Sequence, residues 1–336
     1  MTRSAGTVGL LVGVLAAFVL GCGGGGERSE LDHSGVRLGA VIKGLDNPFF
    51  VTMRAGLVAT ARRQDARLRV SAASAGLQDT TGQSSALESI TAWHPACYVV
   101  NPITRTNLIR ALADVPEKAP IINLDSVIDV KAAEAVGVRV TTYIGTDNRT
   151  GGRLGADEMA TLVRPGARVA VIGGIPGDAG SALRADGFKA GIRGRFRVVA
   201  TVAADFEREK ARRAAADLLR ADPRLAGVFA VNDLMALGAA DAVRAAGRGR
   251  SVKVVGFDGI REALAGIRSG TLAATVAQYP YTIGQLGVEA CLAALQGKRV
   301  PAKVDAPVQV VTRANVARAQ ASFPRPVERF QDPFAR

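Results

Sequence analysis

The sequence predicts an α/β protein with two doubly wound parallel sheets. Short continuous apolar runs, typical of strands buried on both faces, alternate with amphipathic stretches such as residues 207–220 that have helical spacing. About ten such runs occur, which is more than one sheet of this kind commonly holds. The alternation also restarts near Thr146, after the long irregular connection 126–141. We therefore expect two domains in this chain of 336 residues.

The first expected strand, residues 36–42, leads directly into a helix. Asn47 can cap this helix, and Pro48 suits the first helical position because its missing N–H is not needed there. Thr80 and Gln83 have the spacing of a capping box before a later helix. The other expected strands are residues 68–72, 98–100, 120–124, 142–145, 169–172, 198–202, 227–231, 252–257 and 273–277.

The N-terminus has the features of an export signal. Arg3 precedes an apolar run, residues 8–20, that is too short and too rich in small residues for a membrane span. The run ends at Cys22, followed by glycines, in a pattern similar to a bacterial lipoprotein signal, in which the cysteine becomes the lipidated first residue. An ordinary secretory signal is the alternative. We expect residues 1–21 to be the signal, residues 22–35 a flexible tether, and the mature chain to be exported and lipid-anchored.

Composition and charge exclude several functions. The formal charge of +13 comes mostly from arginines scattered through helical stretches, not gathered into a basic run, so nucleic acid is not an expected partner. Cys97 and Cys291 each have the surroundings of a small buried hydrophobe, and the sequence leaves open whether they form a disulfide. No metal-ligand spacing occurs. We expect no metal, no cofactor and a monomer.

The ends of six successive strands carry the clearest functional pattern, because each finishes on a planar or hydroxylic polar side chain. Each of these alone could cap a helix, and we expect at least one of Asn232 and Asp233 to do so. Together they would line the carboxyl edges of two sheets with donors and acceptors suited to a neutral, polyhydroxylated ligand. The polar strand ends are Asn101, Asp125, Thr146–Asp147, Asn232–Asp233, Asp258 and Gln278.

Three phenylalanines near strand ends complete this pattern. Phe49 and Phe50 stand in the first turn of the helix after the first strand, and Phe206 follows a strand of the second half. The flat apolar face of a sugar ring needs an aromatic platform, which these rings could supply. The alternative is that Phe49 and Phe50 enter the local core.

Catalytic patterns are weak. The chain has two histidines, and one, His33, falls on the expected tether, which leaves little for a catalytic triad. The glycine-rich stretch 173–180 lies between a strand and a helix, but it lacks the G-x-G-x-x-G spacing and has no lysine suited to a phosphate loop. We expect a strand-to-helix turn there, and no enzyme.

These motifs together resemble the ribose-type branch of the periplasmic sugar-binding proteins that feed ABC transporters, over residues 36–315. The resemblance implies a type I periplasmic binding protein fold, with two sheet domains joined by three crossings and the ligand between them. The domains would be residues 36–146 with 279–306 and residues 147–278 with 307–314, followed by a loosely ordered tail, 315–336. The matching motifs are residues 46–50, 101–102, 124–125, 146–148, 151–152, 204–206, 232–239, 255–259 and 273–278.

The resemblance also implies which residues contact the sugar. Ribose binders carry an arginine at the position of Ser126, so we expect a larger ring or a polyol in place of ribose. Arg184 falls in place without a gap from Ile175, and its donors suit adjacent hydroxyls. The implied contacts are Asn47, Phe49, Phe50, Asn101, Asp125, Ser126 and Thr146 from the first domain and its hinge, and Arg184, Phe206, Asn232, Asp258 and Gln278 from the second domain and hinge.

The implied mechanism is closure of the two domains around the sugar, followed by delivery to a membrane permease with its separate ATPase subunit. A binding protein that signals to a chemoreceptor or sensor kinase is the alternative. A sugar-responsive repressor shares this fold, but it would need a DNA-binding helix pair before residue 36, where the sequence holds an export signal and glycines.

Overall fold

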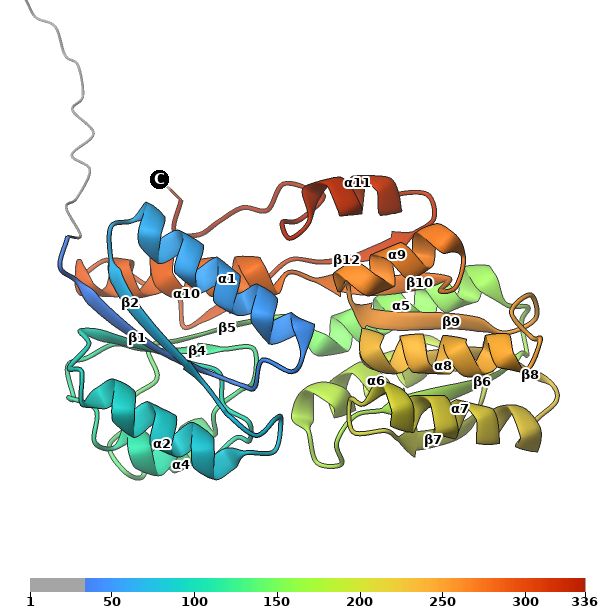
Figure 1. Cartoon of the computed structure of the whole chain (residues 1–336), viewed down its shortest axis with the longest axis horizontal. Coiled ribbons are helices and arrows are strands. Elements are labelled where there is room, and N and C mark those ends of the chain that lie inside the picture. The colour runs from blue at the N-terminus through green and yellow to red at the C-terminus, as the bar shows by residue number, and fades with distance from the viewer. Residues whose placement is uncertain (1–33, 336) are drawn as a thin grey trace, which may run out of the picture. The chain divides into compact units, whose positions relative to one another are not determined.

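The computed structural model describes residues 34–335, which contain two six-stranded sheets covered by helices (Figure 1). The predicted α/β class with two parallel sheets is therefore confirmed. The predicted export signal and Cys22 lie outside the described residues. Within residues 34–335, no helix combines the length and the apolar character that crossing a membrane requires.

The first lobe is built on the sheet of strand order β11-β5-β4-β3-β1-β2, in which every pairing is parallel. Helices α1 and α10 pack on one face of this sheet, and α2, α3 and α4 on the other. Its elements are β1 (Arg37–Ile42), α1 (Pro48–Arg63), β2 (Arg67–Ala72), α2 (Thr80–Thr91), β3 (Cys97–Val100), α3 (Ile109–Leu112), β4 (Ile121–Leu124), α4 (Val130–Glu134), β5 (Thr142–Gly145), α10 (Pro280–Leu295) and β11 (Lys303–Asp305).

The second lobe is built on the sheet of strand order β12-β10-β9-β8-β6-β7, in which only β12 is antiparallel to its neighbour. Its elements are α5 (Asn148–Leu162), β6 (Arg168–Gly173), α6 (Ala179–Gly191), β7 (Arg197–Ala203), α7 (Arg208–Ala221), β8 (Leu225–Ala230), α8 (Asp233–Ala245), β9 (Lys253–Asp258), α9 (Arg261–Ser269), β10 (Ala274–Gln278), β12 (Val308–Thr312) and α11 (Val316–Ser322).

Three connections lead the chain from an element of one sheet lobe to an element of the other, from β5 to α5, from β10 to α10 and from β11 to β12. Because neighbouring strands are parallel in both sheets, except for β12, the carboxyl ends of the parallel strands meet at one edge of each sheet. The crossings join the two lobes beside these edges, so the loops that follow the strands are placed where the lobes face each other (Figure 1).

Close helix packing fixes the elements that carry the expected site. A Cβ on Gly56 of α1 would lie 2.0 Å from the Tyr281 carbonyl oxygen of α10, so only glycine permits this approach. In the second lobe, a Cβ on Gly152 of α5 would lie 2.2 Å from the Arg184 carbonyl oxygen of α6. These two contacts set the positions of α1, which begins with the paired phenylalanines, and of α6, which carries Arg184.

A disulfide joins Cys97 of β3 to Cys291 of α10, with 5.8 Å between their Cα atoms. Both side chains are fully buried, as the sequence predicted. The sequence left open whether they form a disulfide, and the structure shows that they do. The bond closes a sequence separation of 194 residues and ties the returning helix α10 to the centre of the first sheet.

Two local expectations were wrong. The helix cap expected at Thr80 is Asp79, whose carboxylate accepts from Gly82 N, while Gln83 donates to the Asn101 carbonyl oxygen and accepts from Ile103 N. The tail expected to be loosely ordered contains α11, and the residues after α11 pack on both lobes.

Candidate functional site

A cavity of about 740 Å³ lies between the lobes, and loops from the carboxyl edges of both sheets line it. Its size is within the range of small-molecule sites. Most of the residues that the sequence singled out line this cavity: Asn47, Phe49, Phe50, Asp125, Ser126, Thr146, Arg184, Phe206, Asn232 and Asp258.

The aromatic wall of the first lobe begins α1. The Asn47 side chain caps the helix by accepting from Phe49 N at 2.9 Å, and Pro48 takes the first position, both as predicted. The Phe49 and Phe50 rings meet edge to face, with 5.1 Å between their centroids. Both rings also pack into the first-lobe core, as the core interpretation expects, and both line the cavity, as the ligand-surface interpretation requires.

The polar wall of the first lobe centres on Asp125, directly after β4. Its backbone has a φ of 56°, in the left-handed region, and its carbonyl oxygen accepts from Tyr143 Oη at 2.7 Å. Asn101 Nδ2 donates to Asp125 Oδ2 at 3.2 Å, and Ser126 Oγ lies 3.4 Å from the same oxygen. Asp125 lines the cavity, and its Oδ1 accepts no hydrogen bond from residues 34–335.

Asn101 does not line the cavity, although the sequence predicted a direct sugar contact. Its side chain is fully buried, and its amide donates to the Leu124 carbonyl oxygen at 3.1 Å as well as to Asp125. In this arrangement Asn101 orients the carboxylate of Asp125. Asn101 therefore supports a residue of the cavity wall and does not itself form part of the cavity surface.

The polar wall of the second lobe centres on Arg184 of α6, which is almost completely buried. Its Nε donates to Asn148 Oδ1 at 2.7 Å, and its Nη1 donates to the Val231 carbonyl oxygen at 2.9 Å and to Asp258 Oδ1 at 3.3 Å. The guanidinium also lies 4.2 Å from the centre of the Phe257 ring. Contacts from several elements therefore hold this arginine in one orientation.

Asp258 ends β9 with a φ of 126°, a backbone conformation that is rare outside glycine and that turns the chain at this edge of the sheet. Gln278 Nε2 donates to its Oδ1 at 2.7 Å, so Gln278 reaches the site through Asp258 and does not line the large cavity. Burial raises the pKa of Asp258 above its ordinary value, and the positive charge of Arg184 offsets part of that effect.

Asn232 and Asp233 follow β8 and have different roles. Asn232 caps α8 by accepting from Met235 N at 2.9 Å, which confirms the expected cap, and it also lines the cavity. Asp233 is fully buried behind the site and accepts from Gly259 N at 2.7 Å and Thr275 Oγ1 at 2.6 Å. It fixes the turn after Asp258, and burial raises its pKa.

Phe206 supplies the aromatic surface of the second lobe. It and Asp205 both have positive φ, 63° and 55°, which turns the chain sharply after β7. The ring packs over Gly174, where an added Cβ would lie 2.3 Å from it. The stretch 175–180 next to it lines the cavity, and Asp178 caps α6 by accepting from Ser181 N.

Sequence reasoning missed Lys43, Tyr143 and Asn148, which all line the cavity. Lys43 directly follows β1, and its side chain is 8% exposed, with Nζ 5.6 Å from the centre of the Phe50 ring. Among residues 34–335 no carboxylate pairs with it. The rule that polar residues at strand ends form the site would have found Lys43 if it had been extended to charged donors.

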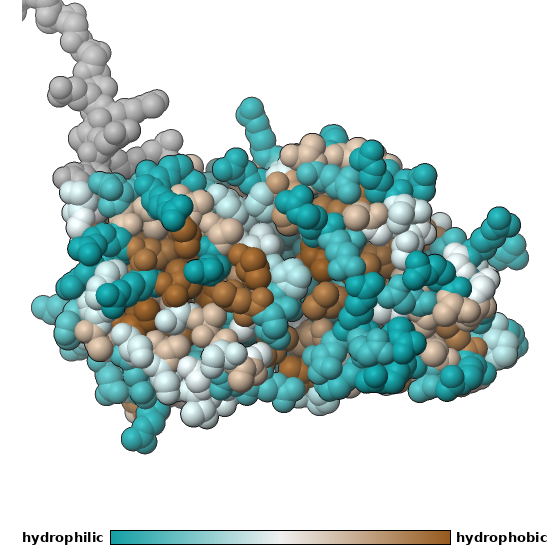
Figure 2. Space-filling view, in the orientation of Figure 1, coloured by the Kyte–Doolittle hydropathy of each residue, from teal (hydrophilic) through white to brown (hydrophobic). Residues whose placement is uncertain are grey.

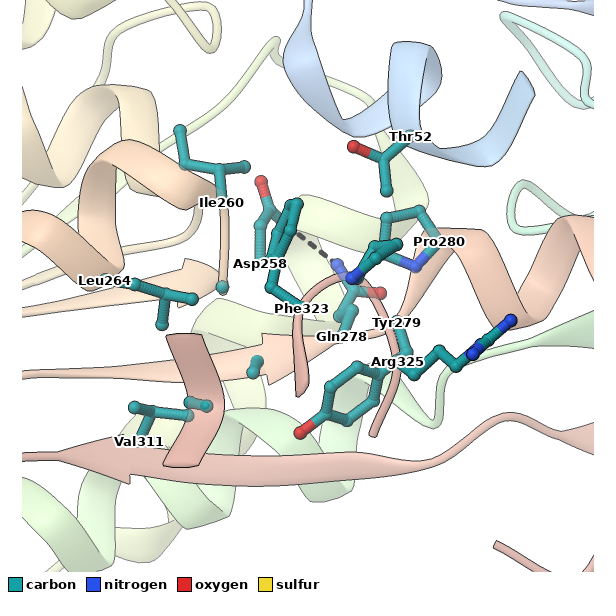
Figure 3. A pocket seen from close by; sticks show the side chains of 14 residues that line it. Thr52, Asp258, Ile260, Leu264, Gln278, Tyr279, Pro280, Val311, Phe323 and Arg325 are labelled. Atoms are coloured by element: carbon teal, nitrogen blue, oxygen red, sulfur yellow. Dashed lines mark hydrogen bonds between the residues drawn. The ribbon is translucent and has the colours of Figure 1, made fainter. Parts of the chain in front are cut away.

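A second cavity, of about 20 Å³, lies behind the site and has room for about one water molecule. Asp258 and Gln278 line one side of it, and Phe323, Pro324 and Arg325 line another (Figure 3). It is far too small for a sugar. It does show that the segment after α11 packs directly behind two residues of the expected site.

Comparison with known proteins agrees with this geometry. The ribose import binding protein of Bacillus subtilis is 33% identical over 276 residues, which cover 82% of this chain and 87% of that protein. The D-allose-binding periplasmic protein of Escherichia coli is 32% identical over 266 residues, covering 78% and 85%. The structure of an ABC transporter periplasmic solute-binding protein from Actinobacillus succinogenes with bound D-allose aligns with a TM-score of 0.79 and 32% identity, covering 84% of this chain and 99% of that one. The family described as periplasmic binding protein domain matches residues 38–299. The chain therefore belongs to the periplasmic binding protein family.

Proposed function

We propose that this protein is the substrate-binding component of a sugar ABC transporter, which captures a monosaccharide or polyol between its lobes and delivers it to a membrane permease. The observation that carries the proposal is that both lobes present an aromatic ring and a carboxylate to one cavity. Phe50 and Asp125 do so from the first lobe, and Phe206 and Asp258 from the second.

The chemistry of the walls fits a polyhydroxylated ring. A sugar has apolar C–H faces, which pack on aromatic rings, and an equatorial belt of hydroxyls, each able to donate and accept. The carboxylates of Asp125 and Asp258 accept from hydroxyls. Arg184, Lys43 and the amide of Asn232 donate to their oxygens. A neutral ligand of this kind leaves no ligand charge to be compensated.

Two half-sites on different lobes make binding dependent on lobe closure. Hinge closure around a ligand is a known motion of periplasmic binding proteins, and membership of that family supports the same motion in this protein. Sugar that contacts both half-sites only in the closed form shifts the population toward that form by its differential affinity. Exposed apolar side chains near the lobe junction, Leu45 and Val51 of the first lobe and Leu183 of the second, offer a surface that a permease would contact. Figure 2 shows apolar surface over the first lobe beside α1.

For the ligand itself, we propose an aldohexose, a pentose other than ribose, or a polyol. Relatives are described as binding ribose and D-allose, and a solute-binding protein from Agrobacterium radiobacter, 30% identical, was solved with D-arabinose. Ser126 presents a short side chain to the cavity and lies close to Asp125, so this edge of the site is less filled than an arginine would make it.

We further propose that the protein is exported, is anchored by a lipid on Cys22 and acts next to its permease. Family membership supports the export. Signalling to a chemoreceptor or sensor kinase would use the same sugar site, and the genes that neighbour this one would distinguish the two roles.

A thermal-shift panel tests the proposal. The chain from Glu27 onward, which retains every described residue, is heated with D-allose, D-ribose, D-arabinose, D-tagatose, glycerol and a set of nucleosides. A ligand present at about 100 times its Kd adds about 2.7 kcal/mol to the free energy of unfolding, which gives a clear rise in Tm. Phe50→Ala and Asp258→Ala should each abolish the rise. A panel without any response to a sugar or polyol would refute the proposal.

A further inference from the structure

The residues after α11, 323–334, cross from the second lobe to the first, and we refer to them as the C-terminal strap (Figure 1). At its second-lobe end, Phe323 packs against the core of that lobe, and the Arg261 guanidinium lies 4.4 Å from the centre of its ring. Val327 packs against the same core. The strap lies beyond residue 299, where the match to the family ends.

At its first-lobe end, the strap is held by two aromatic anchors. Phe330 and Phe334 pack against the core cluster that contains α1 and α10. Between them, Asp332 Oδ2 lies 3.4 Å from Gln285 Nε2 of α10. The same amide donates to Glu289, whose carboxylate also lies 3.7 Å from Arg63 of α1.

Between these ends, the strap passes over the crossing segments. The Arg325 guanidinium lies 5.7 Å from the centre of the Tyr281 ring, directly after the crossing from β10 to α10. Glu328 Oε1 accepts from Gln309 Nε2 at 2.9 Å, and Gln309 Oε1 accepts from Tyr279 Oη at 3.0 Å. The strap therefore adds a non-covalent tie between the lobes to the three covalent crossings.

The strap also contacts the rear of the sugar site. Figure 3 shows Phe323 and Arg325 beside the hydrogen-bonded pair Asp258 and Gln278, around the cavity of about 20 Å³. The buried Gln278 Oε1 has no hydrogen-bond partner among residues 34–335. Asp258 also lines the large cavity, together with residues 103–106 and 175–180, none of which lines the small one.

From this placement we infer that the C-terminal strap opposes closure of the lobes and so sets the affinity for the ligand. A rotation about the crossings that brings the cavity walls together moves the lobes apart on the opposite side, where the strap is attached to both. Closing must therefore disturb the contacts of Phe330 and Phe334 or those of Phe323. The effect on affinity rests on the proposed function, because it assumes that a sugar binds in the cavity. The contacts of the strap with both lobes do not depend on that function.

The first test needs no ligand. Spin labels at Glu134→Cys on α4 and Asp217→Cys on α7, both exposed positions in different lobes, report the interlobe distance by double electron–electron resonance. The chain from Glu27 onward is used, which lacks Cys22, and its two native cysteines, Cys97 and Cys291, are bonded and do not react. Phe330→Ala with Phe334→Ala should broaden the distance distribution and add a shorter population.

The matched control is Arg329→Ala with Gln331→Ala, which changes exposed residues of the same segment and should leave the distribution as in the parent. A distribution identical in the phenylalanine variant and the parent would overturn the inference. Circular dichroism of each variant verifies that the lobes remain folded.

The second test measures affinity by calorimetry with D-allose and D-ribose as probes. Releasing the strap should tighten binding of whichever sugar binds by roughly fivefold or more, a typical coupling between sites, and the control variant should bind as the parent does. Unchanged or weaker binding would overturn the role assigned to the strap. If neither sugar, nor any in the panel above, binds the parent, the proposed function fails while the distance measurement still decides about the strap.

Discussion

Replacing Arg184 by Met is the most direct test of how the second lobe builds its half-site. The substitution keeps most of the side-chain volume but removes the donors to Asn148, to the Val231 carbonyl oxygen and to Asp258. The side chains of Arg184 and Asp258 are only 10% and 6% exposed, so the acceptors left behind are shielded from water. Breaking a buried ion pair by removing one partner costs about 3–5 kcal/mol.

For two reasons we expect Arg184→Met to lower the free energy of unfolding by about 3 kcal/mol, at the lower end of that range. Asp258 retains the hydrogen bond from Gln278, and its raised pKa means that it can take up a proton when the arginine is lost. The double variant with Asp258→Asn should therefore be less destabilised than the sum of the two single variants. Each single variant and the double variant should lose sugar binding, because Asp258 and Arg184 both line the cavity of the proposed sugar site.

Urea unfolding followed by circular dichroism measures the stability, and calorimetry measures the binding. Arg212→Met is the matched control, because Arg212 forms an exposed pair with Glu209 one turn away on α7, and such pairs contribute about 0–1 kcal/mol. If Arg184→Met lowers the free energy of unfolding by less than about 1 kcal/mol and still binds sugar, then the buried ion pair does not stabilise the second lobe and Arg184 is not part of the sugar site.

Three further outcomes follow from the structure. Lys43→Met should weaken sugar binding by about tenfold or more, because Lys43 lines the cavity and a hydrogen bond to a charged group contributes roughly 1.5–3 kcal/mol. Its stability should change little, and calorimetry and urea unfolding measure the two quantities. Replacing Cys97 and Cys291 by Ala together should lower the free energy of unfolding by about 2–4 kcal/mol, and equal stability of parent and variant would contradict this. Burial, with Asp332 close by, raises the pKa of Glu289 to about 8, so the folded state holds a proton that the unfolded state releases near its ordinary pKa. Stability should accordingly fall as the pH rises from about 4.5 to about 8 and level off above that, and Glu289→Gln should flatten that part of the pH profile.

The sequence was sufficient to predict the two sheets and ten of the residues that line the cavity, because both follow from local patterns. Runs such as residues 169–172 are apolar because both faces of their sheet are covered, and the polar residue that ends such a run marks the carboxyl edge. The position of Asp258 follows from that rule alone. The rule does not tell a surface side chain from one just beneath it, which is why Asn101 was expected to touch the ligand.

The strap could not be predicted, because its order depends on surfaces that other parts of the chain create. Phe330 and Phe334 show no periodicity, and the core against which they pack is assembled from α1 and α10. The cap of α2 was displaced by one residue for a similar reason. Gln83, expected to complete the capping box, is drawn into the loop after β3, where Asn101 and Ile103 bond to it.

Ser126 stands at the position where ribose binders carry an arginine, and Lys43 supplies a cation at a different place in the same lobe. The Ser126 hydroxyl lies against the carboxylate of its neighbour Asp125, so the β4 edge of the first lobe presents an acceptor and no cation. One cation of this lobe, Lys43, stands at the end of β1, above the Phe50 ring, while Arg105 and Lys303 line other parts of the cavity. A ligand in the cavity therefore meets a positive donor, Lys43, beside the aromatic platform and an acceptor, Asp125, after β4. Sugars that differ in the placement of a single hydroxyl between these two groups should bind with clearly different affinities.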